Sequence, residues 1–590
     1  MTDATQTTGA ATPATGRSRL AVGLLQGLAL WGLTEAVEQK VWPATQGPVF
    51  GALAMMALLA PFVVLGGLGG LRQRTLIVWS LAAAALLALL GAHDIYRRGA
   101  FDVIDWVGPA VMGYGAAGLF IGHHLIAGAD ADRRFIGRFA TYFDIAWKHG
   151  VQLVLAAGFV GVFWLVLFLG AALFKLIGIG VVQDIIEERW FAFPATTTMF
   201  AAAVQLTDVR HGLIRGIRTV ALTLLSWLLP VLVGLAAAFL MALPFTGLEP
   251  LWGTRRATAI LLSASAVLII LINAAYQDGQ PDTPAPLLLR WAAKIGGVLL
   301  APMTVLATYA LGLRIGQYGL TPDRVVAAAC VFTGLCYAAG YGWAAVRPGI
   351  WMKRLEITNV AVAFVVLGLL LALFTPIADP ARLGVNDQMA RLKAGRVTPE
   401  AFDYAFLRFD GQRYGRAALE RLVKQGGEAG KRAAAALAAG DRGDLPDPAR
   451  PVRLPVFVEV LPKGRALPAG FLDLRGAAND GGLGDCTEKA SPCLALLVDL
   501  DGDAREEVVL SAGWVMLVSS ADANGRWRQV GHIGDPCADT QDALRSGRVR
   551  AIAPVWRDLE LEGRRLRFQA DESVCPVKDG APTSEPRAGR

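Results

Sequence analysis

The run VQLVLAAGFVGVFWLVLFLGAALF, residues 151–174, decides the fold. Its only strongly polar side chain is Gln152. A helix rises about 1.5 Å per residue, so a run of about 20 apolar residues crosses the roughly 30 Å hydrocarbon core of a bilayer. Similar runs recur between residues 19 and 376, and together they predict a mainly α, polytopic bundle of transmembrane helices.

The apolar runs predict about eleven spans. The long run 151–182 suits one tilted span followed by an interfacial segment, with Lys175 reaching the membrane surface. The expected spans are residues 19–37, 49–71, 75–92, 103–127, 150–174, 190–206, 219–243, 257–276, 287–313, 323–346 and 355–376.

Composition supports this class of protein. The chain has 590 residues, of which 54% are hydrophobic and 18% charged, whereas charge becomes frequent only after Asp379. We therefore expect a disordered N-terminal tail (1–18), a transmembrane domain (19–377), an extracytoplasmic helical segment (378–442) and a small, mainly β extracytoplasmic module (443–590). The C-terminal part would be a soluble α+β domain. The run 20–36 lacks a small-residue cleavage site and is expected to be the first anchor, not a cleaved signal peptide.

The net charge of +7 is interpreted as a topological signal, not as a nucleic-acid-binding surface. Lys and Arg gather in alternate connectors, and the richer set includes the N-terminus, which predicts a cytoplasmic N-terminus. An odd number of spans then places the C-terminal domain in the periplasm and the bundle in a bacterial inner membrane. One miscounted span would reverse this orientation.

Four cysteines lie in the C-terminal part, Cys486, Cys493, Cys537 and Cys575. In an oxidising compartment they predict two disulfides, with three connectivities open. No CxxC pair is present among them, which disfavours zinc.

The C-terminal sequence predicts helices followed by strands. TPEAFDYAF offers Thr398 as an N-cap, and RAALERLVKQ and KRAAAALAAG are strong helix formers. After a proline-rich linker, six short β-prone runs follow. They are VFVEVL, CLALLVDL, EVVLSA, WVMLVSS, WRQVGHI and LRFQA.

The loop DLDGDAREE, residues 499–507, is a candidate calcium site. Its expected ligands are the carboxylates of Asp499, Asp501, Asp503 and Glu507 and the backbone carbonyl of Arg505, because hard divalent cations prefer oxygen ligands at such spacing. The loop resembles the calcium loops of FG-GAP and related β-propeller repeats, except that Ala504 replaces the usual glycine and Glu507 an aspartate. The alternative is a solvated acidic turn between two strands.

Polar residues within or beside the spans form a second set of candidates, because a polar group in hydrocarbon requires a partner. Asn273 lies within a span. Arg314, Gln317 and Tyr318 lie at the connector GLRIGQYGLTPDR, which we expect to dock the region FDYAFLRFDGQRYG, residues 402–415. His123 and His124 end a span and are interpreted as interfacial.

The stretches FDIAWKHGVQLVLAAGFVGVFWLVLFLGAALFKLIGI, YALGLRIGQYGLTPDRV and ADPARLGVNDQMARLKAGRVTPEAFDYAFLRFDGQRYGRAALERL resemble the bacterial inner-membrane family named domain of unknown function 4153. The resemblance covers residues 138–422, with weaker agreement in the β region. It implies an uncharacterised membrane protein and carries over no substrate, cofactor or catalytic residue.

Motifs of common enzymes are missing: the sequence contains no HExxH, Walker loop or GxSxG elbow. The sequence therefore favours a non-enzymatic protein that anchors an extracytoplasmic binding or sensing module, whose partners would be the bilayer and envelope proteins or lipids. The alternative is a transporter or channel for a small solute or lipid. An enzyme acting on envelope substrates is a third class.

Overall fold

The computed structural model describes residues 13–99, 106–208, 211–248, 257–279 and 285–440. In the C-terminal part it describes residues 442, 445, 456–474, 483, 486, 492–511, 515–522, 525, 527–534, 544–546, 549, 551–552, 559–561 and 564–566. The chain divides into two compact units. The first comprises residues 1–394 and 410–418, and the second comprises residues 395–409 and 419–590.

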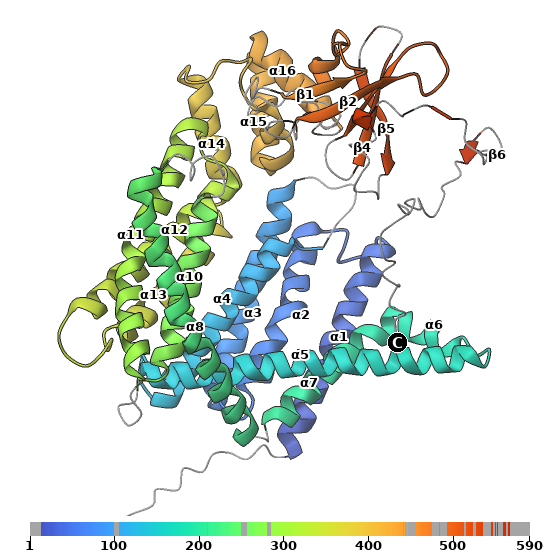
Figure 1. Cartoon of the computed structure of the whole chain (residues 1–590). Coiled ribbons are helices and arrows are strands. Elements are labelled where there is room, and N and C mark those ends of the chain that lie inside the picture. Colours follow the sequence, from blue (N-terminus) through green and yellow to red (C-terminus); the bar gives the residue numbers. More distant parts are fainter. Residues whose placement is uncertain are drawn as a thin grey trace, which may run out of the picture. The chain divides into compact units, whose positions relative to one another are not determined.

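The first unit is helical (Figure 1). Its helices are α1 (Pro13–Glu38), α2 (Gly47–Gly67), α3 (Gln73–Arg98), α4 (Pro109–Asp132), α5 (Phe139–Leu176), α6 (Val181–Glu187), α7 (Arg189–Asp208), α8 (His211–Thr246), α10 (Ala257–Tyr276), α11 (Leu287–Tyr318), α12 (Pro322–Val346), α13 (Leu355–Leu373) and α14 (Pro380–Lys393).

Ten helices in the described ranges are long and apolar enough to cross a membrane: α1–α5, α8 and α10–α13. They match ten of the predicted spans and confirm the polytopic helical architecture. The remaining predicted span, 190–206, is helix α7, which is less apolar and carries three consecutive threonines at 196–198. Helix α1 begins at Pro13 and so includes residues 13–18, for which the sequence predicts disorder; residues 1–12 lie outside the described ranges.

Helix α7 nevertheless accompanies α1 over most of its length. The two run antiparallel, with Arg189 paired to Glu38 near one end and Arg19 Nη2 2.8 Å from Asp208 Oδ2 at the other. Between these pairs the backbones meet, because a Cβ on Gly23 would lie only 2.7 Å from a carbonyl oxygen of α7. Small residues permit such close helix contact within a membrane, as in GxxxG motifs.

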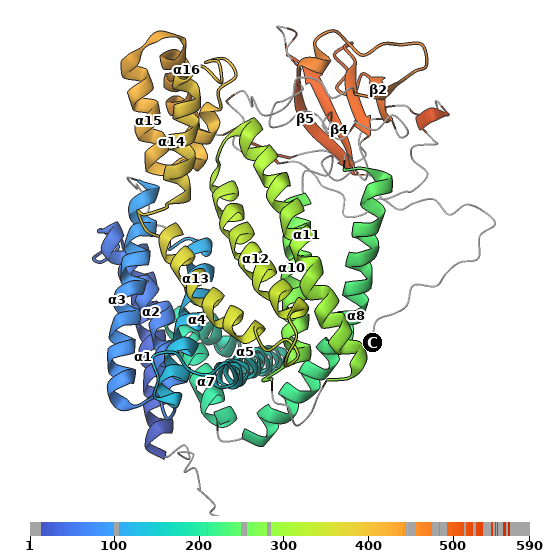
Figure 2. The ribbon, with the colours of Figure 1, turned by 90° about the vertical axis from the view of Figure 1, so that its left-hand side faces the viewer.

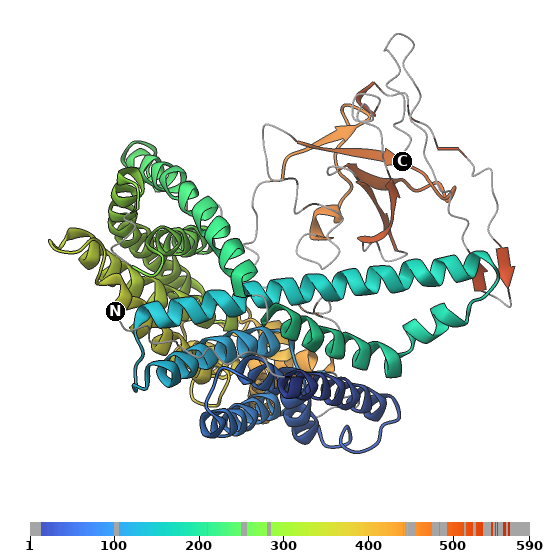
Figure 3. The same ribbon diagram turned by 90° about the horizontal axis from the view of Figure 1, so that it is seen from below.

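Helix α5 has a different orientation from its neighbours. It lies across them in Figure 1, is seen end-on in Figure 2 and is seen along its length in Figure 3. It is one continuous helix of 38 residues, followed by the short α6, so the predicted span and interfacial segment form a single long helix and a turn. Apolar side chains in its second half, such as Leu165 and Leu173, are exposed.

Two large apolar cores, together with smaller clusters, lie within the described part of the first unit. One lies among α8, α10, α11 and α12 and includes the fully buried Leu229, Leu268 and Tyr341. The other joins α1–α4 with the end of α13 and includes Phe50 and Met55. In water, burying each such side chain would stabilise the fold by roughly 1.5–3 kcal/mol. Within lipid, the helices associate through van der Waals contacts between closely packed side chains instead.

The second unit contains helices and a small mixed sheet. A π-helical turn (η1, Phe406–Asp410) precedes α15 (Gln412–Gln425) and α16 (Gly427–Ala438), and the first half of α15 is grouped with the first unit. The helical prediction holds for these segments, but residues 398–403 form turns and not the helix expected to begin at Thr398.

The sheet has five strands in the order β1-β2-β3-β4-β5. They are β1 (Val458–Leu461), β2 (Cys493–Val498), β3 (Glu507–Ser511), β4 (Val515–Ala521) and β5 (Trp527–Gly534). Strands β1 and β2 are parallel and the other neighbours antiparallel. Five of the six predicted strands are therefore present; LRFQA lies mostly outside the described residues, and only its first residue joins the hairpin of β6 (Leu559–Leu561) and β7 (Arg564–Leu566).

Candidate functional site

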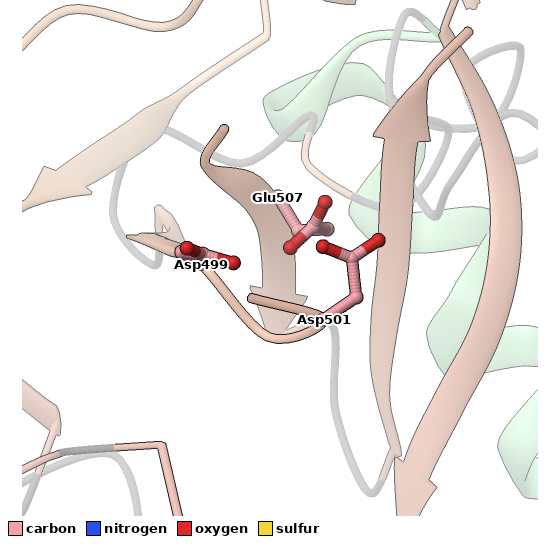
Figure 4. A group of neighbouring side chains, drawn as sticks. All are labelled: Asp499, Asp501 and Glu507. Carbon is pink, nitrogen blue, oxygen red and sulfur yellow. The ribbon is translucent and has the colours of Figure 1, made fainter. Parts of the chain in front are cut away.

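The loop between β2 and β3 brings three of the predicted calcium ligands together. Figure 4 shows the carboxylates of Asp499, Asp501 and Glu507, and one oxygen of each lies within 4.8 Å of the others. Asp503 is not part of this group, and its Oδ1 instead accepts the backbone N–H of Arg505 at 2.8 Å. A role for the carbonyl of Arg505 stays a prediction.

Backbone amides already contact these carboxylates. Asp499 accepts the N–H of Gly502 at 2.7 Å and of Ala504 at 3.0 Å, and Glu507 accepts the N–H of Leu500 at 2.8 Å. These donors offset part of the repulsion among the three negative charges. The loop is thus shaped by its own hydrogen bonds, and each carboxylate retains lone pairs that a hard cation could use.

Cys486 and Cys493 form a disulfide, with their Cα atoms 5.4 Å apart. It ties the chain before β2 to the first residue of that strand. Cys537 and Cys575, the other two predicted disulfide cysteines, lie outside the described residues.

Asn273 belongs to a closed ring of three polar side chains. Its Nδ2 donates to the Tyr341 hydroxyl at 2.6 Å, this hydroxyl donates to Asn359 Oδ1 at 2.9 Å, and Asn359 Nδ2 donates back to Asn273 Oδ1 at 2.7 Å. The ring joins the end of α10, α12 and the start of α13. The partner that a polar group in hydrocarbon requires is supplied by its neighbours.

The side chains and backbone of the connector between α11 and α12 also have partners within the first unit. The guanidinium groups of Arg314 and Arg324 lie 6.0 and 5.5 Å from the Tyr318 ring centroid, so these three side chains gather at the connector. Its docking partner in the first unit is α14. Gln388 Nε2 donates to the carbonyls of Tyr318 at 2.8 Å and Leu320 at 3.1 Å.

Two more α14 side chains complete this contact. Asp387 Oδ2 accepts the N–H of Leu320 at 2.8 Å, and Arg391 Nη2 donates to the carbonyl of Gln317 at 2.9 Å. Gln317, predicted as a polar candidate, therefore contributes a backbone carbonyl. The segment that docks lies upstream of the expected residues 402–415, most of which belong to the second unit.

Asp379 fixes the start of α14. Its Oδ1 caps the helix by accepting the N–H of Ala381 at 2.9 Å, and its Oδ2 lies 3.1 Å from His93 Nε2 of α3. Burial raises the pKa of Asp379, but the hydrogen bond from His93, the charge of Arg97 and the capping amides outweigh burial and hold the pKa below its usual value.

Three histidines meet around a cavity of about 240 Å³ between α2, α4, α5 and α7. His123 and His124 are only 6% and 7% exposed, so they are buried among the helices. Their position at the membrane interface stays a prediction. His124 Nε2 lies 3.0 Å from His149 Nδ1, and Trp79 Nε1 donates to His123 Nδ1 at 3.2 Å. The Nε2 atom of His123 is buried and has no hydrogen-bond partner among the residues that the structure describes.

A second cavity of similar size, about 250 Å³, differs in its chemistry. It lies among α3, α4 and α13, and aliphatic and aromatic side chains such as Leu86, Leu367 and Phe374 line it. Trp79 borders this cavity and also bonds His123 of the first one.

The sequence alone did not predict the histidine cluster. His149 lies 25 residues from His124 and on a different helix, so no short motif joins them. The available signal was the placement of all three histidines, with Gln152, inside or beside otherwise apolar runs.

A family model described as "Domain of unknown function (DUF4153)" matches residues 50–424, which reaches further toward the N-terminus than the stretches that carried the resemblance. No curated protein and no solved structure matched the chain.

Proposed function

This chain belongs to the family described as domain of unknown function (DUF4153), and we propose that it is a non-enzymatic membrane anchor for a C-terminal binding or sensing module. The first unit would hold the chain in the bilayer, and the second unit would meet envelope proteins or lipids. The bilayer itself is the partner that the ten apolar helices indicate.

The attachment of α14 carries this proposal. A flexible tether would leave the last span and enter the soluble part directly, whereas here the chain leaves α13 and is bonded to two separate places in the bundle. One is His93 of α3, and the other is the α11–α12 connector. The exit of the chain from the bundle is therefore fixed, which suits a module that must be held or must respond to the bundle.

The ring of Asn273, Tyr341 and Asn359 favours an anchor over the alternative, a transporter or channel. Asn273 is the predicted polar candidate that lies within a span, where a solute pathway would require polar groups. Its hydrogen-bonding groups are used by neighbouring helices, as expected for a packed bundle.

We further propose that the bundle lies in a bacterial inner membrane, with the N-terminus cytoplasmic and the module periplasmic. The distribution of Lys and Arg supports this orientation. The Cys486–Cys493 disulfide supports it as well, because disulfides persist in oxidising compartments. A calcium ion held by Asp499, Asp501 and Glu507 would stabilise the turn between β2 and β3.

Gly319→Ala tests the anchor. Gly319 has φ +77°, and a Cβ there would lie 2.6 Å from Asp387 Oδ2 and from Gln388 Nε2, so we expect α14 to detach. The measurement is the rate of protease cleavage at residues 394–403 of the full-length protein. We expect this rate to rise about tenfold, because the substitution should reduce the free energy of α14 docking by about 1–2 kcal/mol.

Gly316→Ala is the matched control, because this glycine is helical and a Cβ added to it would have no atom within 4 Å. Its cleavage rate should equal that of the original protein. Equal rates for both variants would mean that α14 does not depend on the connector, and the anchoring role would lose its main support.

A further inference from the structure

The cavity between α2, α4, α5 and α7 presents a hydrogen-bond donor to an apolar space. Trp79 Nε1–H can only donate, so His123 Nδ1 must accept at 3.2 Å. The ring of His123 is then uncharged and carries its proton on Nε2. This N–H is buried and has no partner, and it lines the cavity.

The other two histidines are bonded to the backbone and to each other. His124 Nδ1 lies 2.6 Å from the carbonyl oxygen of Phe120, which can only accept, so this nitrogen carries a proton. In the uncharged ring its Nε2 then accepts from His149 Nδ1 at 3.0 Å. The direct His124–His149 contact and the proton on His123 Nε2 both disfavour a three-histidine metal site, since metals bind the unprotonated nitrogen.

One further polar side chain lines the cavity, Gln152, whose Nε2 donates to the Val204 carbonyl at 2.8 Å. The rest of the wall is apolar and includes Phe62 and Phe200. The volume of about 240 Å³ exceeds the roughly 150 Å³ that suffices for benzene in an apolar protein cavity. A substituted ring would fit. A buried donor without a partner costs about 1–3 kcal/mol, which a ligand carbonyl would recover.

We propose that this cavity binds a lipid-soluble molecule whose uncharged ring carries a hydrogen-bond-accepting carbonyl, of the kind found in isoprenoid quinones. The carbonyl oxygen accepts from His123 Nε2, and the ring packs against Phe62 and Phe200. An apolar pocket with few placed polar groups is the usual form of a small-molecule site. The proposal does not rest on the anchoring role, because the residues that line the site belong to α2, α4, α5 and α7 and not to α14.

The test uses the full-length protein in lipid nanodiscs and a dimethoxy-methyl-benzoquinone with one isoprenyl unit as the probe. Binding is measured by equilibrium dialysis against the matching arene, in which both carbonyl oxygens are absent. We expect one quinone to bind per chain. The arene should bind about tenfold more weakly, because it cannot form the one buried hydrogen bond that the quinone forms. This comparison requires no variant.

Two variants locate the site. His123→Leu should weaken quinone binding about tenfold and leave arene binding unchanged. Gly66→Val should abolish binding of both compounds, because a Cβ at Gly66 already lies 3.3 Å from His123 Nε2. Gly118→Val is the matched control, since Gly118 lines the apolar cavity instead, and it should leave quinone binding unchanged.

Equal affinity for quinone and arene would overturn the proposal, as would unchanged binding in Gly66→Val or loss of binding in Gly118→Val alone. Stoichiometric Zn²⁺ binding that competes with the quinone and disappears in His123→Leu would assign the cluster to a metal instead. Elution volume and melting temperature without ligand verify that each variant is folded.

Discussion

At the scale of single residues, the polar ring of Asn273, Tyr341 and Asn359 makes a measurable contribution to stability. Asn273→Leu would leave the Tyr341 hydroxyl and the Asn359 amide each without one partner. We expect a loss of about 1–3 kcal/mol, measured by denaturant unfolding in detergent. Ser265→Ala on the same helix is the control, because the Ser265 hydroxyl donates to the Leu261 carbonyl of its own helix at 2.8 Å. This substitution should cost less than about 0.5 kcal/mol.

The double variant Asn273→Leu, Asn359→Leu separates a ring from independent bonds. In a ring the second substitution removes a group that the first has already left unpaired, so the double variant should lose less stability than the sum of the single variants. Strict additivity would show that the two amides are not coupled.

Ala504 shows how one residue departs from a loop pattern. It has φ +66°, a left-handed conformation that favours glycine, which is the residue usual at this position in the calcium loops that the sequence resembles. Ala504→Gly should therefore stabilise the turn by about 0.5–1 kcal/mol, measured as slower hydrogen exchange of β2 and β3 amides in the full-length protein.

Gly502 provides the opposite test within the same turn. Its φ is +82°, so Gly502→Ala should accelerate the same exchange. If both substitutions acted in one direction, backbone strain would not control this loop.

At the scale of elements, the charge of Asp379 makes the attachment of α14 dependent on pH. Its pKa is lower when the helix is docked than in the unfolded chain. The charged form therefore stabilises docking fully above the usual aspartate pKa of about 3.9, and this stabilisation is lost as the pH falls through the lower folded value.

Asp379→Asn isolates this effect, because asparagine retains the N-cap and removes the charge. Between pH 5 and 6 we expect α14 amides to exchange faster in the variant than in the original protein. The difference should disappear as the pH falls below about 4. A constant difference across this range would assign the stabilisation to groups other than this carboxylate.

Hydrophobic patterning predicts elements well but not their contacts. The apolar runs correctly predicted the long helices of the first unit, including α7, and the short β-prone runs predicted five strands. The docking of α14 was not predicted, because Gln388 and Arg391 bond backbone carbonyls, which every sequence offers. The histidine cluster was missed for a related reason, since α4 and α5 must pack before His149 reaches His124.

At the scale of the whole molecule, the orientation proposed above depends on whether α7 crosses the membrane. Reporter fusions ending at Gly180, which precedes α6 and α7, and at Asp208, the last residue of α7, test this directly. If α7 crosses the membrane, one fusion should show alkaline phosphatase activity and the other should show fluorescence of the cytosolic reporter. Equal signals would leave ten crossings and return the C-terminal module to the side of the N-terminus.

Trp79 lines the apolar cavity, and its indole N–H donates to His123, which lines the other cavity. Anything that fills either space changes the surroundings of the same fluorophore. Trp79 is thus an intrinsic fluorescent probe of both cavities. Subtracting the emission spectrum of Trp79→Phe from that of the original protein would isolate its signal from that of the other 14 of the 15 tryptophans.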